Sequence, residues 1–392
     1  MQQQLINLSP DLKKLRDEGL SLMINGGYVC IHHIPYVNEK KEVKFGTLIS
    51  ELTIAGGSSA KPSTHAIYFM GEKPCHKNGT EQIEIVNSSP HQALVGDLVG
   101  DHYLSSKPSI GYYENYYDKF SRYIQLLSIP ARSINPNVTA YNFDPVIDTA
   151  EETVFNYLDT SSSRANITKV NEKFKGQKVG IIGLGGTGSY ILDLVSKTPV
   201  TEIHLFDADD FSQHNAFRSP GAASLEALNE KLKKAEYFQR IYSNMHKGIV
   251  SHIAYVNEDN IELIKDLSFV FICVDKNSVR QQIIQQLLKF EIPFIDVGLG
   301  VTLVDDQLIG IVRTTTGTPQ KSDHLEKRIA QEDTDQNEYV TNIQIADLNA
   351  LNAVMAVIKW KKLSGFYQDL IHEHQTSYSI NVGQLLNGDT TD

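Results

Sequence analysis

The sequence has only three cysteines, Cys30, Cys75 and Cys273, among 392 residues. Three thiols cannot build a disulfide framework, and no two of them have the CxxC spacing that holds zinc in many small domains. Cys273 stands in the apolar segment FICVD and is expected to be a small buried residue. Cys75 precedes His76 in the segment GEKPCHKNG, where we expect a turn rather than a metal ligand or a nucleophile.

Two further absences limit where the chain acts and what it binds. No run of about 18 apolar residues is present, and residues 1–25 lack the apolar core of a signal peptide, so we expect a cytoplasmic protein without membrane contact. Lysine and arginine number 36 against 47 aspartate and glutamate residues, which gives a formal net charge of -11. This excess of negative charge argues against binding to nucleic acid.

The length of the chain and a change in its pattern near residue 150 indicate two domains. Residues 1–150 contain short β-type segments separated by Gly, Pro, Asn and Ser, among them GGYVCIHHIPYV, GTLISELTI, STHAIYFM and EQIEIVN. A tyrosine-rich segment, GYYENYYDKFSRYIQLLSI, has helical character toward its end. We expect residues 1–150 to form the smaller domain, a β-rich α+β domain.

Residues 151–392 have a different pattern, in which short apolar strands alternate with helices. The expected strands are VGIIG, EIHLFDAD, HIAYVN, SFVFICVD and FIDVG. Three helices are expected: one that follows VGIIG and ends at Ser196, one at 224–243 and one at 277–289. This alternation predicts an α/β fold, a doubly wound, mostly parallel, Rossmann-like sheet with its ligand at the carboxyl ends of the strands. The segment LIGIVRTT then predicts an antiparallel strand added to this sheet. The segment ADLNALNAVMAVIKWKKL predicts a long, largely apolar helix.

The segment VGIIGLGGTGSYIL places a GxGGxG turn between a strand and a helix. Its glycines are Gly183, Gly185, Gly186 and Gly188. Glycine allows positive φ and close backbone approach, so phosphate oxygens can meet main-chain N–H groups at a helix N-terminus. Asp207 follows at the end of the next strand, where a carboxylate can accept hydrogen bonds from ribose hydroxyls. The pattern predicts a nucleotide site but leaves NAD and ATP both open.

Four residues downstream favour ATP, namely Asn215, Arg218, Lys234 and Asp275. Hydride transfer needs a nicotinamide pocket and a proton-transfer group, and it needs none of these four residues. Attack of a carboxylate on the α-phosphate of ATP needs cations, which Arg218 and Lys234 supply. It also needs a carboxylate that holds Mg²⁺ near the leaving pyrophosphate, and Asp275 follows a strand beside the glycine turn. We therefore expect ATP and Mg²⁺ at this site.

In order and approximate spacing, the motifs GLGGTG, LFDADDFSQHNAFR, KKAEYF and CVDKNSVR resemble those of the ThiF/MoeB superfamily, the adenylating cores of ubiquitin-activating enzymes. The resemblance covers about residues 164–362, roughly half of the chain. It implies that Asp207 binds the ATP ribose, that Asp209 belongs to the same site and that Asp275 binds Mg²⁺. It implies phosphate contacts for Asn215, Arg218 and Lys234.

The same resemblance implies partners. Such cores are dimers or pseudo-dimers in which an arginine ahead of the glycine strand reaches the partner's ATP. Arg164 has that place by spacing, and one core per chain implies a homodimer; the alternative for Arg164 is a solvated loop residue. Residues 1–150 resemble the amino-terminal domain of bacterial ThiF-type proteins encoded beside ubiquitin-like proteins. That likeness implies recruitment of the ubiquitin-like protein or of a conjugating-enzyme relative.

The sequence departs from the family in its cysteines. Many relatives hold zinc with two CxxC pairs or carry a catalytic cysteine before the last long helix, but the segment SDHLEKRIAQEDTDQNEYVTNIQIADLN has none. The acyl group would then pass directly from the adenylate, form an oxyester, or meet a thiol from a partner. Thr341, directly before the long helix, is our preferred hydroxyl. Other hydroxyls are Thr334 nearby and Thr314, Thr315, Thr316 and Ser322 in what we expect to be an earlier loop; an ordinary loop or capping role stays open for each.

These observations predict ATP- and Mg²⁺-dependent adenylation of the C-terminal glycine carboxylate of a ubiquitin-like protein, with release of pyrophosphate. The first alternative is a scaffold that binds nucleotide without turning it over. An NAD-dependent oxidoreductase is the second, which the motifs NAFR and CVDKNSVR disfavour. Small-molecule chemistry, such as activation of a peptide or a tRNA-linked acid, is the third.

Overall fold

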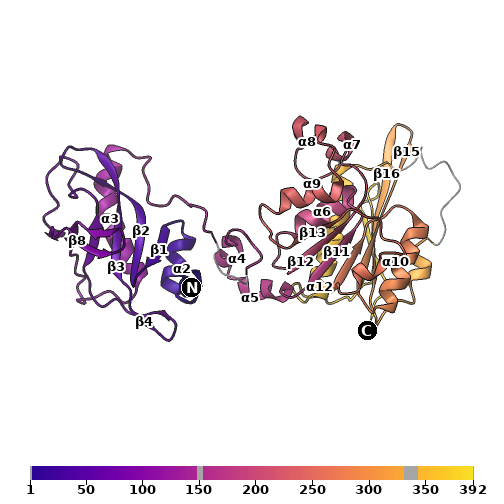
Figure 1. Cartoon of the computed structure of the whole chain (residues 1–392), viewed down its shortest axis with the longest axis horizontal. Coiled ribbons are helices and arrows are strands. Elements are labelled where there is room, and N and C mark those ends of the chain that lie inside the picture. The colour runs from indigo at the N-terminus through magenta and orange to yellow at the C-terminus, as the bar shows by residue number, and fades with distance from the viewer. Residues whose placement is uncertain (1, 148–152, 331–342, 392) are drawn as a thin grey trace. The chain divides into compact units, whose positions relative to one another are not determined.

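The computed structural model describes residues 2–147, 153–330 and 343–391. The chain divides into two compact units, one formed by Met1–Glu152 and Tyr157–Arg164, the other by Thr153–Asn156 and Ala165–Asp392 (Figure 1). Each unit has a hydrophobic core of its own. The boundary expected between residues 150 and 151 falls on residues that the structure does not describe.

The N-terminal unit is built on an antiparallel sheet of six strands. In spatial order they are β1 (Ser21–Asn25), β2 (Tyr28–Val37), β3 (Val43–Glu51), β6 (Ile67–Met70), β10 (His102–Leu104) and β7 (Val86–Ser88). Two small hairpins, β4 (Ile54–Ala55) with β5 (Ser58–Ser59) and β8 (Gln92–Val95) with β9 (Leu98–Gly100), accompany it. The helices are α1 (Gln2–Leu8), α2 (Pro10–Asp17), α3 (Tyr116–Ile134) and α4 (Thr160–Arg164). This confirms the expected β-rich α+β fold.

The buried face of α3 closes the core of this unit. Phe120, Tyr123 and Leu127 recur at helical spacing and pack with Val29 and Ile31 of β2. The side chain of Asn115 caps the helix, because it accepts a hydrogen bond from the Asp118 N–H. The strand expected over EQIEIVN is wrong for most of its length, since the Gln82 carbonyl accepts hydrogen bonds from the N–H groups of Ile85 and Val86, which form a turn.

One lysine lies inside this core. Lys119 on α3 is 1% exposed, and its Nζ donates a hydrogen bond of 2.8 Å to Ser50 Oγ on β3. Burial lowers the pKa of its ammonium group to about 8. The N-terminal unit therefore contains a cation that destabilises it at neutral pH.

Lys119→Met is expected to stabilise the N-terminal unit at pH 7 by up to ~3 kcal/mol and to have a much smaller effect at pH 10. The pKa of Lys119 in the folded chain, about 8, lies below the ordinary value of 10.5. Between these pH values the unfolded chain binds more protons, so the stability of the native chain rises with pH. Urea unfolding followed by circular dichroism measures the difference. Emission from the buried Trp360 reports the C-terminal unit separately. An equal effect at both pH values would contradict this account.

The C-terminal unit contains a sheet of eight strands. In spatial order they are β13 (Ile249–His252), β12 (Glu202–Phe206), β11 (Lys178–Ile182), β14 (Phe269–Ile272), β15 (Phe294–Val304), β16 (Gln307–Gly317), β17 (Gln375–Ser379) and β18 (Gln384–Gly388). The first five are parallel and the rest antiparallel. All residues of β14 are apolar and buried, as expected for a parallel strand covered on both faces. The predicted doubly wound, mostly parallel fold is confirmed.

Helices cover both faces of this sheet. On one face α6 (Gly186–Val195), α9 (Lys234–Tyr242) and α12 (Ala346–Leu363) contribute to a core around Trp360. On the other face α10 (Asn277–Lys289) and η2 (Ile261–Ile264) pack on β11, β12 and β14. The shorter helices are α5 (Thr168–Asn171), η1 (Glu172–Phe174), α7 (Gln213–Ala216), α8 (Leu225–Asn229) and α11 (Leu325–Arg328). The helices predicted at 277–289 and over ADLNALNAVMAVIKWKKL are confirmed.

Two of the predicted elements are wrong in their extent. The helix expected at 224–243 is divided into α8 and α9, because Lys231 has a positive φ of 52° and Lys233 forms a β-bridge with Asp210. The strand expected over HIAYVN starts where β13 ends. The bounds of β13 are set by its pairing with β12, in which Ile249–His252 lie beside Ile203–Phe206.

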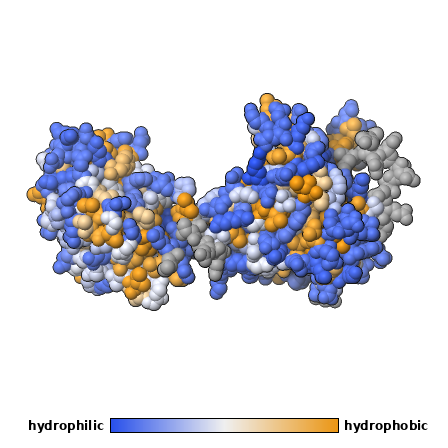
Figure 2. Space-filling model, in the orientation of Figure 1, coloured by the Kyte–Doolittle hydropathy of each residue, from blue (hydrophilic) through white to orange (hydrophobic). Residues whose placement is uncertain are grey.

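The surface of the chain mixes hydrophilic and apolar residues on the face seen in Figure 2. Large exposed apolar side chains on the antiparallel strands of the C-terminal unit include Leu303, Ile311, Leu385 and Leu386. Among the described residues, no helix combines the length and the apolar character needed to cross a membrane.

Candidate nucleotide-binding site

The glycine turn connects β11 to α6 at the switch point of the parallel sheet, where β12 lies on one side of β11 and β14 on the other. Gly183 has φ +90°, and a Cβ there would lie 2.7 Å from the Cys273 carbonyl oxygen. A Cβ on Gly188 would lie 2.0 Å from the Gly183 carbonyl oxygen. On Gly186 it would lie 2.0 Å from Nδ2 of Asn349, on α12. These three glycines are required by packing.

Gly185 is different from the other three glycines. It precedes the first residue of α6, and a Cβ at this position would meet no atom within 4 Å. Packing within the chain therefore does not require glycine there. Close approach of a ligand to the free N–H groups of the helix N-terminus would require it.

The carboxylate of Asp207 connects the end of β12 to this turn. Its Oδ2 accepts a hydrogen bond of 2.7 Å from the Leu184 N–H, and its Oδ1 accepts one of 2.9 Å from the Asp209 N–H. Asp207 is buried, and this burial raises the pKa of its carboxyl group against the opposing effect of Lys234. The carboxylate is held at the switch point by two main-chain donors.

Lys234, the first residue of α9, extends the same network. Its Nζ lies 2.6 Å from Asp209 Oδ2 and 3.7 Å from Asp207 Oδ1. The Tyr255 hydroxyl donates to Asp209 Oδ1. Burial favours a higher pKa for Asp209, but the hydrogen bonds from Lys234 and Tyr255 lower it below its ordinary value. Sequence reasoning missed Tyr255, whose only signal is its position shortly after β13.

Three buried side-chain donors near this site have no partner among the residues that the structure describes. They are Asn215 Nδ2, Arg218 Nε and, against the glycine turn, Asn349 Nδ2. Asn215, on α7, is 2% exposed, and its Oδ1 already accepts a hydrogen bond of 2.9 Å from the Ser212 N–H. Burial lowers the pKa of Arg218, and the charges of Asp275 and Asp209 oppose that shift. Buried donors are rarely left unpaired, so a ligand rich in acceptor oxygens, such as a triphosphate, fits them.

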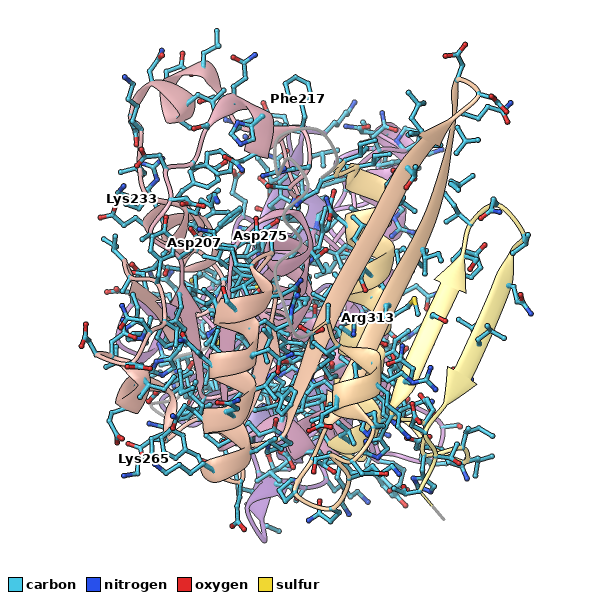
Figure 3. All side chains as sticks on the ribbon, turned by 90° about the vertical axis from the view of Figure 1, so that its right-hand side faces the viewer. Asp207, Phe217, Lys233, Lys265, Asp275 and Arg313 are labelled. Carbon is cyan, nitrogen blue, oxygen red and sulfur yellow. The ribbon has the colours of Figure 1, made fainter. Side chains whose placement is uncertain are left out.

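Asp275 follows β14 and is exposed (Figure 3). No group of three or more His, Cys, Asp and Glu residues in the described part of the chain could hold a metal ion alone. Mg²⁺ often binds through one or two carboxylates, with phosphate oxygens and water as its other ligands. The donor set therefore fits Mg²⁺ bound to a nucleotide and does not fit an independent metal centre.

The remaining candidate residues are an arginine of the N-terminal unit and residues outside the described part of the chain. Arg164 ends α4 in the N-terminal unit, where its guanidinium lies 5.6 Å from the centre of the Phe143 ring. Thr341 and Thr334 lie outside the described residues.

The expectation of a loop at Thr314, Thr315 and Thr316 is wrong. These residues belong to β16 and are at most 3% exposed, and Thr315 Oγ1 donates to Gln375 Oε1 at 2.7 Å. Because all three residues are buried, their hydroxyls are not available to an acyl group. Ser322 lies beyond the strand, between β16 and α11.

Cys75 is buried, whereas Cys273, expected from the sequence to be buried, is only half-buried. Cys75 is 1% exposed, burial raises the pKa of its thiol, and His76 pairs with Glu84 at 3.3 Å. Cys273 is half-buried against the core beside α6, where desolvation raises its pKa strongly.

Comparison with known proteins adds to this geometry. The model of the ThiF family matches residues 162–382, more than half of the chain. The chain belongs to the ThiF family. Residues 10–160 of this ThiF family member match a domain of unknown function, DUF6791. A comparison with curated proteins gave no match.

Solved structures similar to this ThiF family member include MccB of E. coli with MccA-N7isoASN. That match has 16% identity, covers 59% of this chain and 69% of the other, and has a TM-score of 0.47. MccB of E. coli with ATP matches at 18% identity over 57% of this chain and 67% of the other, with a TM-score of 0.44. PaaA matches at 17% identity over 59% and 80%, with a TM-score of 0.45.

Proposed function

We propose that this protein uses ATP and Mg²⁺ to adenylate the C-terminal glycine carboxylate of a ubiquitin-like protein, with release of pyrophosphate. The pair of orphaned donors, Arg218 Nε and Asn215 Nδ2, carries the proposal, because buried donors without partners favour a ligand with many acceptor oxygens. Arg218 also interacts electrostatically with Asp209 and with Asp275. The charges of the acids that follow β12 and β14 therefore both act on Arg218.

The reaction forms one bond and breaks one. A carboxylate oxygen of the protein substrate attacks the α-phosphorus of ATP, and the bond from that phosphorus to the bridging oxygen of pyrophosphate breaks. Arg218 and Lys234 would stabilise the charge that develops on the phosphate oxygens, and Asp207 would hold the ribose. Mg²⁺, held by Asp275, would neutralise charge on the leaving pyrophosphate.

The thiols of the chain support transfer without a cysteine thioester. Cys30 and Cys75 are at most 1% exposed, and burial raises the pKa of all three cysteines. A reactive cysteine has a lowered pKa and an accessible sulfur. Within the proposal, the acyl group passes directly from the adenylate to its acceptor or through a hydroxyl, with Thr341 as the candidate.

The proposal includes partners. A homodimer is supported by α12, which is apolar on most sides and leaves Val354 and Ile358 39% and 42% exposed. In such a dimer Arg164 would approach the ATP of the partner. The N-terminal unit would recruit the ubiquitin-like protein or a conjugating-enzyme relative.

The test of the function is ATP–pyrophosphate exchange by the purified chain with Mg²⁺ and a small β-grasp protein encoded beside it. Exchange that requires the terminal glycine of the small protein supports the proposal. Exchange with a short peptide in place of the small protein would show a different acyl donor. Bound ATP without exchange for either donor would favour the scaffold, and binding of NAD in preference to ATP would favour the oxidoreductase.

Arg218→Ala is expected to lower kcat/KM for ATP in this exchange by about 100-fold, because the variant loses the unpartnered donor and its charge. Arg218→Lys should recover part of the loss. Arg240→Ala, which removes an exposed arginine of α9 that pairs with Glu230, is the matched control and should act as the wild type does. An equal loss in the two alanine variants would argue against a phosphate contact by Arg218.

A further inference from the structure

The buried carboxylate of Asp296 connects three elements of the C-terminal unit. Asp296 has no exposed surface, and it lies on β15 in register with Ile272 of β14 and Thr315 of β16. Its Oδ1 lies 2.8 Å from Nε of Arg280 on α10, and its Oδ2 lies 2.7 Å from Nη2 of Arg313 on β16. Each oxygen therefore lies at ion-pair distance from a different guanidinium, and of the two contacts only the one from Arg313 has the geometry of a hydrogen bond.

Arg280 also holds the loop between β14 and α10. Its Nη2 donates a hydrogen bond of 2.5 Å to the Val274 carbonyl, and its Nη1 donates to Asn277 Oδ1. Asp275 lies between those two residues. Its own carboxylate is exposed and makes no hydrogen bond or ion pair with the residues that the structure describes. The place of Asp275 is therefore set by the backbone that Arg280 holds on both sides.

The position of Arg280 depends in turn on Asp296. Arg280 is 8% exposed, and a guanidinium this far from water is strongly disfavoured without a counter-charge. If Asp296 lost its charge, the buried Arg280 and the half-buried Arg313 would lose their shared partner. Arg280 would then gain by turning toward solvent and releasing Val274 and Asn277.

We propose that Asp296 is a positioning residue for adenylation, which acts through Arg280 to hold the loop 274–277 so that the Asp275 carboxylate meets Mg²⁺ on the triphosphate. The inference rests on the proposed function. It assigns a role in metal binding to a residue that does not touch the metal.

Asp296→Asn tests the proposal, because it removes the charge and keeps the size of the side chain. Displacement of a fluorescent ATP analogue gives the ATP affinity with Mg²⁺ and in EDTA, and exchange gives the Mg²⁺ dependence. We expect the Mg²⁺ concentration for half-maximal exchange to rise at least ~10-fold, with the ATP affinity in EDTA changed less than ~2-fold. An unchanged Mg²⁺ dependence, or an equal loss with and without Mg²⁺, would overturn the proposal.

A matched control separates positioning from a loss of stability. Asp369 is another largely buried carboxylate between two cations of the same unit, 2.9 Å from Lys359 Nζ and 3.4 Å from Lys362 Nζ. Asp369→Asn should lose stability and keep the Mg²⁺ dependence of the wild type. A shift as large as that of Asp296→Asn would overturn the proposal.

Arg280→Lys serves if Asp296→Asn does not fold. Its ammonium keeps a charge beside Asp296 but cannot also reach Val274 and Asn277, so the same shift in Mg²⁺ dependence is expected. Wild-type Mg²⁺ dependence in this variant would overturn the proposal.

The affinity measurement needs no acyl donor. Failure of exchange in the wild type would therefore count against the proposed function alone, whereas ATP affinity without any Mg²⁺ dependence in the wild type would count against the positioning role.

Discussion

Asp275→Ala is expected to reduce ATP–pyrophosphate exchange by about 1,000-fold and to leave the chain folded. Asp275 is exposed, so its removal costs little stability. The same change removes the carboxylate proposed to hold Mg²⁺ against the leaving group, and such charge stabilisation contributes several kcal/mol to the transition state. Initial rates of exchange at saturating ATP and Mg²⁺ measure the effect, and the melting temperature confirms folding.

Asp266→Asn is the matched control for this experiment. Asp266 is also exposed, but it precedes β14, whereas Asp275 follows it. The control variant should keep wild-type exchange. An Asp275→Ala enzyme that retained more than about a tenth of wild-type exchange would exclude Asp275 as a required metal ligand.

Gly188→Ala is expected to destabilise the C-terminal unit by about 3 kcal/mol. The added Cβ would lie 2.0 Å from the Gly183 carbonyl oxygen and 3.3 Å from Cys273 Cβ, so α6 would have to move away from β11. Urea unfolding followed by Trp360 emission measures the change.

Gly185→Ala separates packing from ligand approach at the same turn. Its Cβ would meet no atom within 4 Å, so the free energy of unfolding should change by less than ~1 kcal/mol. Its affinity for ATP should fall, because the methyl group stands at the N-terminus of α6. Equal losses in the free energy of unfolding of the two variants would show that contact with a Cβ at position 188 is not the reason why this turn needs glycine there.

Much of the fold follows from local sequence pattern. The glycine turn marks the junction of β11 and α6, and the helix at 277–289 has the bounds expected from its periodicity. The misassigned segments depend on distant partners. A β-bridge from Asp210 to Lys233 interrupts the expected helix at 224–243, and pairing with β12 sets the bounds of β13. Neither interaction is visible in a local window of sequence.

The candidate site also contains some residues that the sequence motifs identify and others that only the folded structure identifies. Motifs name Asp207, Lys234 and Asp275 because each follows a strand or begins a helix at the carboxyl edge of the sheet. Asp296 stands in the apolar segment FIDVG, where its charge is the only signal of a special role. Its ion pairs with α10 and β16 join residues 16 and 17 positions away, and only the folded chain shows them.

The way the chain passes between its two units has a practical consequence for dissecting the protein. Residues 153–156 belong to the C-terminal unit, although residues 157–164 return to the N-terminal one. Within the C-terminal unit, the Lys247 N–H donates to the Val154 carbonyl at 2.7 Å, and Asn156 Nδ2 donates to the Ser243 carbonyl at 2.7 Å. A fragment that starts at Ala165 leaves the Lys247 N–H and the Ser243 carbonyl without these partners. A fragment that ends at Glu152 lacks α4. No single cleavage point therefore yields both halves intact, and separately produced halves must overlap in sequence from Thr153 to Arg164.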